Sequence, residues 1–219
     1  NFLPALMTEL GRLGVKEQSY FHVSDEPYGP HLETYRQCKE LVEPYLEGRP
    51  IMDALSGFEY YEQGVSENPI PASNHIQPFL DAEVPDLWTY YCCSQNVDVA
   101  NRFVSQPSYR NRIIGVQMYV GKIVGFLHWG YNFYYTQYAA TPVNPYLVTD
   151  SGGSFPSGDP FVVYPGADGQ PEESLRWVVF SDALEDLRLL QALEAQVGRE
   201  AVLELIRETA AATGASEEE

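Results

Sequence analysis

Apolar residues recur at intervals of three and four along much of the chain, which is the spacing of an amphipathic helix. Within residues 2–14 this stripe consists of Leu3, Leu6, Leu10 and Leu13, and the segment ends in a glycine. Further helices are predicted at residues 31–48, 74–82, 108–121, 174–197 and 199–212. Asp182 and Glu185 have the spacing of a capping box, which is typical of a helix start.

Shorter apolar and aromatic runs, bounded by turn-forming residues, predict β-strands between these helices. They lie at residues 18–24, 51–55, 87–93, 123–129 and 161–164. Residues 58–71, around a short helix, and residues 139–160 are predicted to be loops because they are rich in Gly, Pro and polar residues. The alternation of strands and helices indicates an α/β fold with a parallel sheet. Five strands are too few for a closed eight-stranded barrel, so an open sheet or the second half of a barrel would fit.

Composition narrows the possible functions. The 219 residues are 44% hydrophobic and 20% charged, as in an ordinary globular protein. The net charge of -18 repels phosphate backbones, so we expect no nucleic-acid partner. No apolar run is long enough to cross a bilayer. The chain starts with Asn1, so we expect the natural N-terminus to lie upstream, and a cytoplasmic or a secreted bacterial protein would both fit.

The strongest candidate for chemistry is the pair Asp25 and Glu26, which follows a β-prone run and precedes Pro27. Barrel enzymes place acid and base groups at the carboxyl ends of strands. Neighbours on a strand point to opposite faces, so both carboxylates reach one site only if the chain bends there. Alternatively, Asp25 caps a helix that begins with Glu26 and Pro27.

A second candidate is the aromatic segment His128–Tyr135, at the end of the fourth predicted strand. Its Trp129 and Tyr131 offer flat faces to sugar rings, and Asn132 can hydrogen-bond to hydroxyl or amide groups. The alternative is that these side chains pack in a core and a surface loop.

Other catalytic and cofactor signatures are absent from the sequence. It has no HExxH or CxxC pattern, no GxSxG elbow and no phosphate-binding glycine loop. Its three cysteines imply no disulfide framework. We therefore expect no metal and no cofactor, and we interpret His22 as a hydrogen-bond partner of the carboxylates rather than a metal ligand.

Taken in order, several motifs resemble glycoside hydrolase family 123, the β-N-acetylgalactosaminidases, and related uncharacterised barrel domains. The matching segments are His22–Pro27, Phe126–Asn132, Tyr164–Gly166, Ser174–Arg176 and Ser181–Asp186, and they cover most of residues 10–195. The chain departs from the family pattern at Ser181, where an arginine is usual, and at Leu187 and Arg188, where aromatic residues are usual. These departures indicate a distant member.

The resemblance implies a (β/α)8 TIM-type barrel of which this chain holds the C-terminal half. Residues 1–197 would be the partial catalytic barrel, and residues 198–219 a C-terminal helix with an acidic tail. The first strands and an N-terminal β-sandwich would lie upstream. A partner chain or a homo-oligomer could also complete the barrel.

The resemblance also implies a reaction: retaining, substrate-assisted hydrolysis of a terminal β-linked N-acetylhexosamine, with N-acetylgalactosamine favoured, on a glycan or glycoconjugate. Glu26 would be the general acid/base, and Asp25 would orient the 2-acetamido group. The sugar site would be lined by Trp129, Tyr131 and Asn132, with His22 and Tyr91 as weaker candidates.

Three alternatives stay open. The chain could be a non-catalytic carbohydrate-binding module that kept its aromatic platform, or a structural fragment without a ligand. A glycosidase with a carboxylate nucleophile is also possible, because Asp53, Glu59 and Glu62 lie on and after the second predicted strand.

Overall fold

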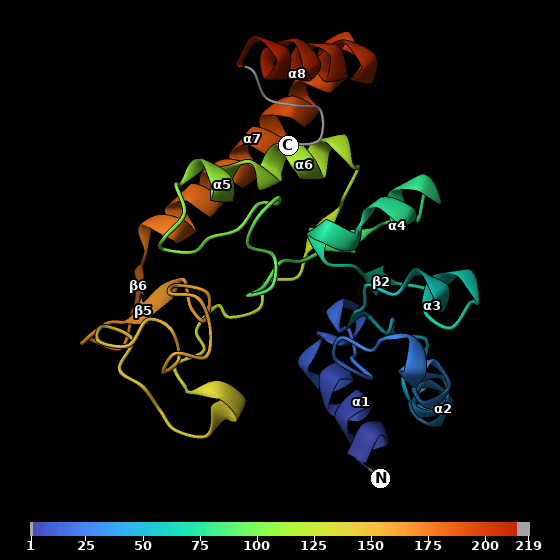
Figure 1. The fold of residues 1–219 in the computed structure, drawn as a ribbon. Coiled ribbons are helices and arrows are strands. Elements are labelled where there is room, and N and C mark those ends of the chain that lie inside the picture. Colours follow the sequence, from blue (N-terminus) through green and yellow to red (C-terminus); the bar gives the residue numbers. More distant parts are fainter. Residues whose placement is uncertain (1, 214–219) are drawn as a thin grey trace. The chain divides into compact units, whose positions relative to one another are not determined.

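The computed structural model describes residues 2–213 (Figure 1). The chain forms two compact units, Asn1–Tyr90 with Gly125–Leu127, and Tyr91–Val124 with His128–Glu219. The acidic tail expected after Thr213 lies outside the described residues.

The first unit contains a ladder of short parallel pairings that follow chain order. Phe21 bridges to Ile51, and Ala72 bridges to Tyr90. The paired strands are β1 (Asp53–Ala54) with β2 (Pro69–Ile70), and β3 (Trp88–Thr89) with β4 (Gly125–Phe126). Each pairing joins a segment to the next one along the chain, which is the connectivity of successive βαβ units.

Helices connect these strands within the first unit. Its helical elements are α1 (Phe2–Leu13), η1 (Lys16–Gln18), η2 (Gly29–His31), α2 (Leu32–Val42), η3 (Glu43–Tyr45), α3 (Phe58–Glu62), η4 (Ser73–His75) and α4 (Gln77–Asp81). Tyr35, Leu55, Tyr60 and Val65 form a buried cluster, against which Val23 packs. This cluster therefore fixes the segment that leads to Asp25 and Glu26.

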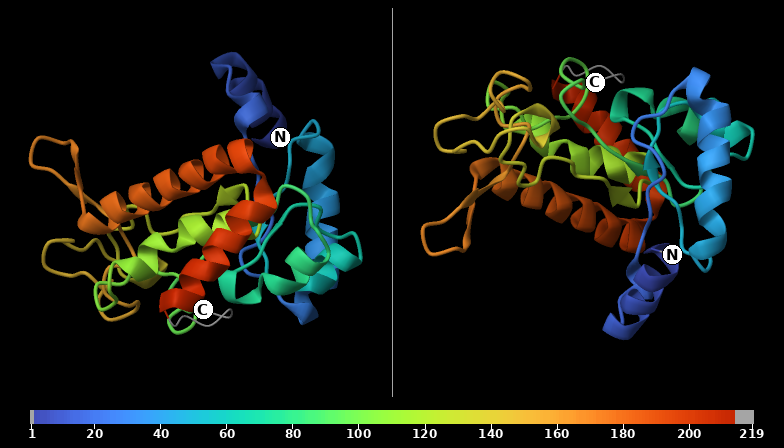
Figure 2. Two further views of the ribbon diagram at one scale, coloured as in Figure 1. Left: turned by 90° about the horizontal axis from the view of Figure 1, so that it is seen from above. Right: turned by 90° about the horizontal axis from the view of Figure 1, so that it is seen from below.

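The second unit is built around a long helix. Its elements are α5 (Tyr109–Arg112), α6 (Ile114–Val120), η5 (Gln137–Ala139), β5 (Val163–Pro165), β6 (Pro171–Glu173), α7 (Leu175–Val197) and α8 (Arg199–Thr213). Figures 1 and 2 show α5 and α6 beside α7. At Gly115 the backbones come so close that an added Cβ would lie 1.9 Å from the Ala183 carbonyl oxygen. Arg112 and Asp186 join α5 to α7 through two hydrogen bonds of 2.7 and 2.9 Å.

Most predicted helices are confirmed, and capping explains the start of α7. The Ser174 hydroxyl accepts the Trp177 amide there. The capping-box interpretation of Asp182 and Glu185 is wrong, because both residues lie in the middle of α7. The predicted helix 31–48 is interrupted at Pro44, where η3 replaces the α-helix.

The strands agree less well with the sequence. A parallel, mixed α/β arrangement is present in the first unit, but its strands are two residues long and the predicted segment 18–24 retains only the Phe21 bridge. The strand β2 lies within the segment 58–71, where the sequence predicts a loop. The strand predicted at residues 161–164 is present in part as β5, but its expected parallel direction is wrong, because β5 pairs antiparallel with β6. Only short sheets are formed among the described residues, so the expected half-barrel is not confirmed.

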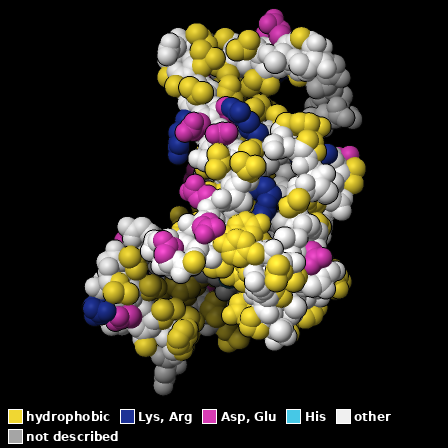
Figure 3. Space-filling model, turned by 90° about the vertical axis from the view of Figure 1, so that its left-hand side faces the viewer, with side chains coloured by type: hydrophobic (Ala, Val, Ile, Leu, Met, Phe, Trp, Pro, Cys, Tyr) yellow, Lys and Arg dark blue, Asp and Glu magenta, His cyan; other side chains and the backbone are white. Residues whose placement is uncertain are grey.

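Large apolar side chains are exposed in both units, as in Leu41, Val124, Leu147, Leu175 and Leu189. Figure 3 shows apolar side chains alternating with acidic and basic ones on one face of the molecule.

No helix among residues 2–213 is long and apolar enough to cross a membrane.

Candidate active site

The carboxylate pair lies in an exposed loop that leaves the parallel ladder after Phe21. Asp25 and Glu26 are both exposed, and Pro27 is buried. Glu26 has a φ of 44°, so the backbone turns into the left-handed region at this residue. The next helix begins only at Gly29, so the helix-cap interpretation of Asp25 is wrong. The bend required to bring neighbouring carboxylates toward one site is therefore present.

Contacts from the first unit hold this loop at several points. The Glu26 amide donates to the Ala54 carbonyl at 3.0 Å, beside the end of β1. The Tyr60 hydroxyl donates to the Tyr28 carbonyl at 2.9 Å. The Tyr90 hydroxyl, next to the end of β3, donates to Oε1 of Glu26. The loop thus places the Glu26 carboxylate against a tyrosine from another strand end.

Asp53 lies beneath the same loop and is fully buried. It accepts hydrogen bonds from the Val23 amide, the Ser24 amide and the Tyr35 hydroxyl at 2.8, 3.2 and 2.7 Å. Burial and the contact with Asp53 raise the pKa of Tyr35 well above its usual value. The exposed His22 ring has Nδ1 3.4 Å from Oδ1 of Asp53. Burial and three donors make Asp53 unsuited to attack a substrate, which argues against it as a carboxylate nucleophile.

The aromatic segment belongs to the second unit, where Trp129 is half-buried. Its indole Nε1 donates to Asp159 at 3.2 Å, and its ring packs against Phe155 with centroids 5.0 Å apart. Gly130 has a φ of 62°, and a Cβ at this position would lie 2.5 Å from the Asp159 carbonyl oxygen. Only glycine fits this turn without a shift of the backbone.

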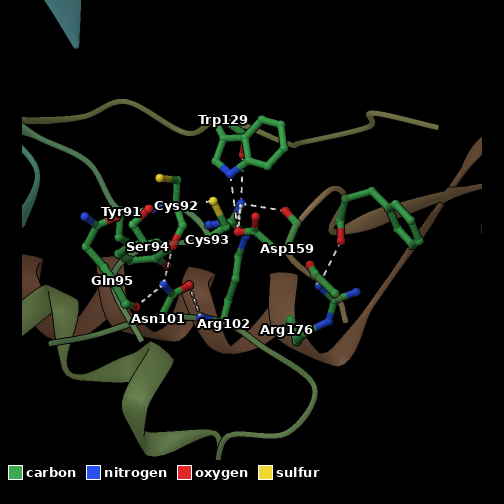
Figure 4. Close-up of polar contacts among 12 residues, drawn as sticks. Tyr91, Cys92, Cys93, Ser94, Gln95, Asn101, Arg102, Trp129, Asp159 and Arg176 are labelled. Carbon is green, nitrogen blue, oxygen red and sulfur yellow. Dashed lines mark hydrogen bonds and ion pairs between the residues drawn. The ribbon is translucent and has the colours of Figure 1, made fainter. Parts of the chain in front are cut away.

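A buried ion pair supports the turn at Trp129 (Figure 4). Arg102 and Asp159 are both fully buried, with Nη2 and Oδ1 3.6 Å apart. Arg102 also donates to the carbonyls of Trp129 and Asp159 at 2.8 and 2.9 Å. Burial raises the pKa of Asp159 to about 6, against the opposing effect of Arg102. This network fixes the backbone at Trp129, just before the glycine, and at Asp159, whose carbonyl faces the glycine.

Tyr131 and Asn132 are exposed and line a surface pocket of about 360 Å³. Tyr134 and Tyr164 also contribute to it, so the pocket is rich in tyrosine. It offers both flat rings and hydrogen-bonding groups, which are the features that sugars require.

Tyr91 occupies a different environment from these exposed residues. It is fully buried, its hydroxyl donates to Asn111 at 3.2 Å, and the Arg102 guanidinium lies over its ring at 5.2 Å (Figure 4). Contact between Tyr91 and a sugar stays a prediction that would require this side chain to be uncovered.

Comparisons with known proteins assign the family. The catalytic-domain model of glycoside hydrolase 123 matches residues 1–193. The chain belongs to glycoside hydrolase family 123.

A solved structure supports the fold of this family 123 chain. It comes from work on "the details of glycolipid glycan hydrolysis by the structural analysis of a family 123 glycoside hydrolase from Clostridium perfringens". The TM-score is 0.68 at 16% sequence identity, over 94% of this chain and 37% of that one. No curated protein matches the sequence. Because the alignment covers 37% of the Clostridium perfringens structure, this chain spans little more than a third of that protein's length.

The sequence of this family 123 chain points to the carboxylates and the aromatic segment but not to several residues around them. It contains no local signal for Tyr90, Arg102 or Asp159, and it suggests Asp53 only as a nucleophile. The hydrogen-bond and ion-pair partners named above lie 18 to 64 residues away along the chain, so no local pattern could reveal these contacts. Within residues 2–213 no three His, Cys, Asp or Glu side chains gather as metal ligands would, and we propose no metal site.

Proposed function

We propose that this chain is part of the catalytic domain of a retaining glycoside hydrolase that removes terminal β-linked N-acetylhexosamine by substrate assistance. The observation that carries the proposal is the Asp25-Glu26 pair, exposed on a bent and anchored loop within the segment that matches the family 123 catalytic domain. The substrate would be a glycan or glycoconjugate, in line with the glycolipid glycan named for the Clostridium perfringens relative.

In this mechanism Glu26 first acts as a general acid and protonates the glycosidic oxygen as the bond to the anomeric carbon breaks. The carbonyl oxygen of the 2-acetamido group attacks that carbon and forms an oxazolinium ion, so no protein nucleophile is needed. Glu26, now ionised, takes a proton from a water that attacks the same carbon and reopens the ring. Two inversions at one carbon leave its configuration unchanged.

Asp25 would bind the acetamido N–H and stabilise the positive charge of the oxazolinium ion. The left-handed backbone at Glu26 supports this division of roles, because it breaks the alternation that would direct the two carboxylates to opposite faces. The Tyr90 hydroxyl would keep the Glu26 carboxylate in one orientation between the two steps.

We further propose that Trp129, Tyr131 and Asn132 contribute to sugar binding, with His22 and Tyr91 as weaker candidates. The tyrosine-rich pocket beside Tyr131 and Asn132 supports this assignment. The preference for N-acetylgalactosamine over N-acetylglucosamine rests on the family resemblance alone.

The parallel strand pairs follow chain order, which supports the proposal that this chain is a segment of a (β/α)8 barrel. The exposed apolar side chains support the proposal that further protein covers them. An upstream half of the barrel or a second copy of the chain would supply it. Sedimentation analysis of this chain and of an upstream-extended protein would distinguish the two.

The test is hydrolysis of 4-nitrophenyl β-N-acetylgalactosaminide and of its glucosamine analogue by both proteins. We expect Glu26→Gln to lower, but not abolish, the release of nitrophenol, because this leaving group needs little protonation. The same substitution should abolish release of the terminal sugar from natural glycans. Glu40→Gln is the matched control, because Glu40 is exposed on α2 and is not among the candidate carboxylates. We expect Asp25→Asn to lower the rate on both kinds of substrate.

Two further measurements address substrate assistance. A thiazoline analogue of the oxazolinium ion should inhibit the wild type, and proton NMR should show the β-anomer as first product. A folded, upstream-extended protein that hydrolyses neither sugar would sink the proposal. Binding of N-acetylhexosamine without hydrolysis would then favour the carbohydrate-binding module.

A further inference from the structure

Asp53 occupies a gap in the backbone pairing of the loop that carries Asp25 and Glu26. On the N-terminal side, the Phe21 amide donates to Pro50 and its carbonyl accepts from Met52. On the C-terminal side, the Glu26 amide donates to Ala54. The gap between these backbone contacts contains Val23 and Ser24.

The two amides in the gap bind the Asp53 side chain instead of a neighbouring strand. Oδ1 of Asp53 accepts from Val23 at 2.8 Å and from Ser24 at 3.2 Å. Backbone N–H groups that lose their partner in a part-buried site cost free energy, so a side-chain acceptor here substitutes for the ladder. Ser24 is the residue before Asp25, so this bond sets the backbone one residue before the proposed reacting pair.

A second contact fixes the orientation of Asp53 itself. Its Oδ2 accepts the Tyr35 hydroxyl at 2.7 Å, and Tyr35 belongs to the buried cluster that also contacts Val23. The carboxylate thus links the cluster to the loop, and neither of its oxygens faces solvent.

We propose that Asp53 is a positioning residue for the reaction, which holds the Val23–Ser24 backbone so that Asp25 and Glu26 meet the substrate in register. The inference rests on the proposed glycosidase function. Asp53 acts through the backbone and touches no reacting atom. Small displacements of reacting groups have large effects on rate, so loosening this loop lowers kcat more than it changes KM.

Two substitutions at Asp53 separate its acceptor role from its charge. Asp53→Asn keeps Oδ1 as an acceptor for both amides, and the Tyr35 hydroxyl can rotate to accept from the new amide. Asp53→Leu has a similar size and no acceptor. We expect kcat within about threefold of wild type for D53N, and a fall of at least about 30-fold for D53L with KM changed less than about threefold.

Tyr35→Phe measures how much the contact that orients Asp53 contributes, because it removes the donor to Oδ2 and leaves both loop amides bonded. We expect its kcat to fall less than about fivefold. If circular dichroism shows that D53L does not fold, Asp53→Ser replaces it. The serine side chain is too short to reach the Val23 and Ser24 amides, so the carboxylate acceptor is still lost, but water can fill the space and bind these amides. The same result is expected for D53S.

Hydrogen exchange of the full chain gives a readout that does not depend on activity. Exchange at Val23 and Ser24 should be faster in D53L or D53S by at least about tenfold and unchanged in α7, while D53N resembles wild type. A folded D53L or D53S with kcat within about twofold of wild type overturns the proposal, as does unchanged exchange at both amides. An upstream-extended wild type that folds but is inactive would instead refute the proposed function, and exchange would still decide whether Asp53 holds the loop.

Discussion

Protonation of His128 should destabilise the second unit in mild acid. The ring contacts three aromatic side chains edge to face, Tyr131, Trp177 and Phe180, with centroids 6.2, 6.3 and 5.5 Å away. Burial, followed by the nearby charge of Arg102, lowers the pKa of His128 from 6.5 to about 3. The folded state therefore holds His128 neutral at pH values where the unfolded chain binds a proton.

The magnitude follows from the two pKa values. Stability from the neutral ring is complete above pH 6.5 and is lost as the pH falls toward 3, because the unfolded state binds more protons throughout that interval. The full difference of roughly 3.5 pKa units corresponds to about 5 kcal/mol. At pH 5 the expected loss is about 2 kcal/mol, and at pH 4 about 3 kcal/mol.

The assay compares urea unfolding of wild type and His128→Phe at several pH values from 7 to 4, followed by tryptophan fluorescence. Phenylalanine keeps a ring in the aromatic cluster and cannot titrate. Only the change of stability with pH is compared, so a constant packing difference cancels. Asp159 changes stability in the opposite direction, because its pKa is raised in the folded state and stability is lost as the pH rises toward 6. Wild type and H128F share this contribution, so it cancels in the comparison.

The difference between wild type and H128F should grow by about 2 kcal/mol between pH 7 and pH 5. His75→Gln is the control, because His75 is exposed on η4, and it should follow the wild-type curve. Parallel curves for wild type and H128F, or an NMR titration of His128 near pH 6.5, would refute the argument.

Three further predictions concern contacts that the structure adds to the two candidate segments. Tyr90→Phe removes the hydroxyl that binds Glu26, and we expect kcat/KM to fall about tenfold in the nitrophenyl assay. Arg102→Met leaves a buried carboxylate without its cation and should destabilise the protein by about 3–5 kcal/mol in urea unfolding, far more than the same change at the exposed Arg112. Gly130→Ala should cost at least about 2 kcal/mol of stability in the same assay, because a Cβ would clash with a carbonyl at a positive φ.

Control variants separate these effects from general damage. Tyr138→Phe changes an exposed tyrosine and should leave kcat/KM at the wild-type value. Gly153→Ala introduces a side chain at a φ of 82° where nothing lies within 4 Å, so it should cost only about 1 kcal/mol. Equal losses in G130A and G153A would show that the close approach at Gly130 is unimportant, and equal losses in R102M and R112M would show the same for burial of the ion pair.

Helices were predictable from the sequence because their signals are local. The leucine stripe marked α1, and Ser174 with the periodic run after it marked α7. The chain also contains misleading local signals, since Asp182 and Glu185 match a capping box in the middle of α7. Asp182 and Glu185 lie inside a continuous helix because α7 packs against α6 along this stretch, and a capping pattern contains no information on such packing.

Strand pairing was less predictable because it depends on contacts distant in sequence. Pro69 suggested a loop, yet it is the first residue of β2, where a missing N–H is tolerated. Residues 161–164 have the apolar character of a buried strand, but periodicity contains no information on direction, and β5 pairs antiparallel through the turn at Gly166 and Gly169.

The two candidate segments are held by different physical means, and this difference has a consequence for kinetics. The Asp25-Glu26 loop is fixed by hydrogen bonds to Asp53, Ala54 and Tyr90, all within the first unit. The turn at Trp129 is fixed within the second unit by a buried ion pair and by a glycine at which a Cβ would clash with the Asp159 carbonyl. If the first segment performs the chemistry and the second binds the sugar, changes to the anchors of the loop should lower kcat, whereas changes behind Trp129 should raise KM. Substitutions that moved both parameters together from either side would instead indicate that binding and chemistry depend on one shared structural element.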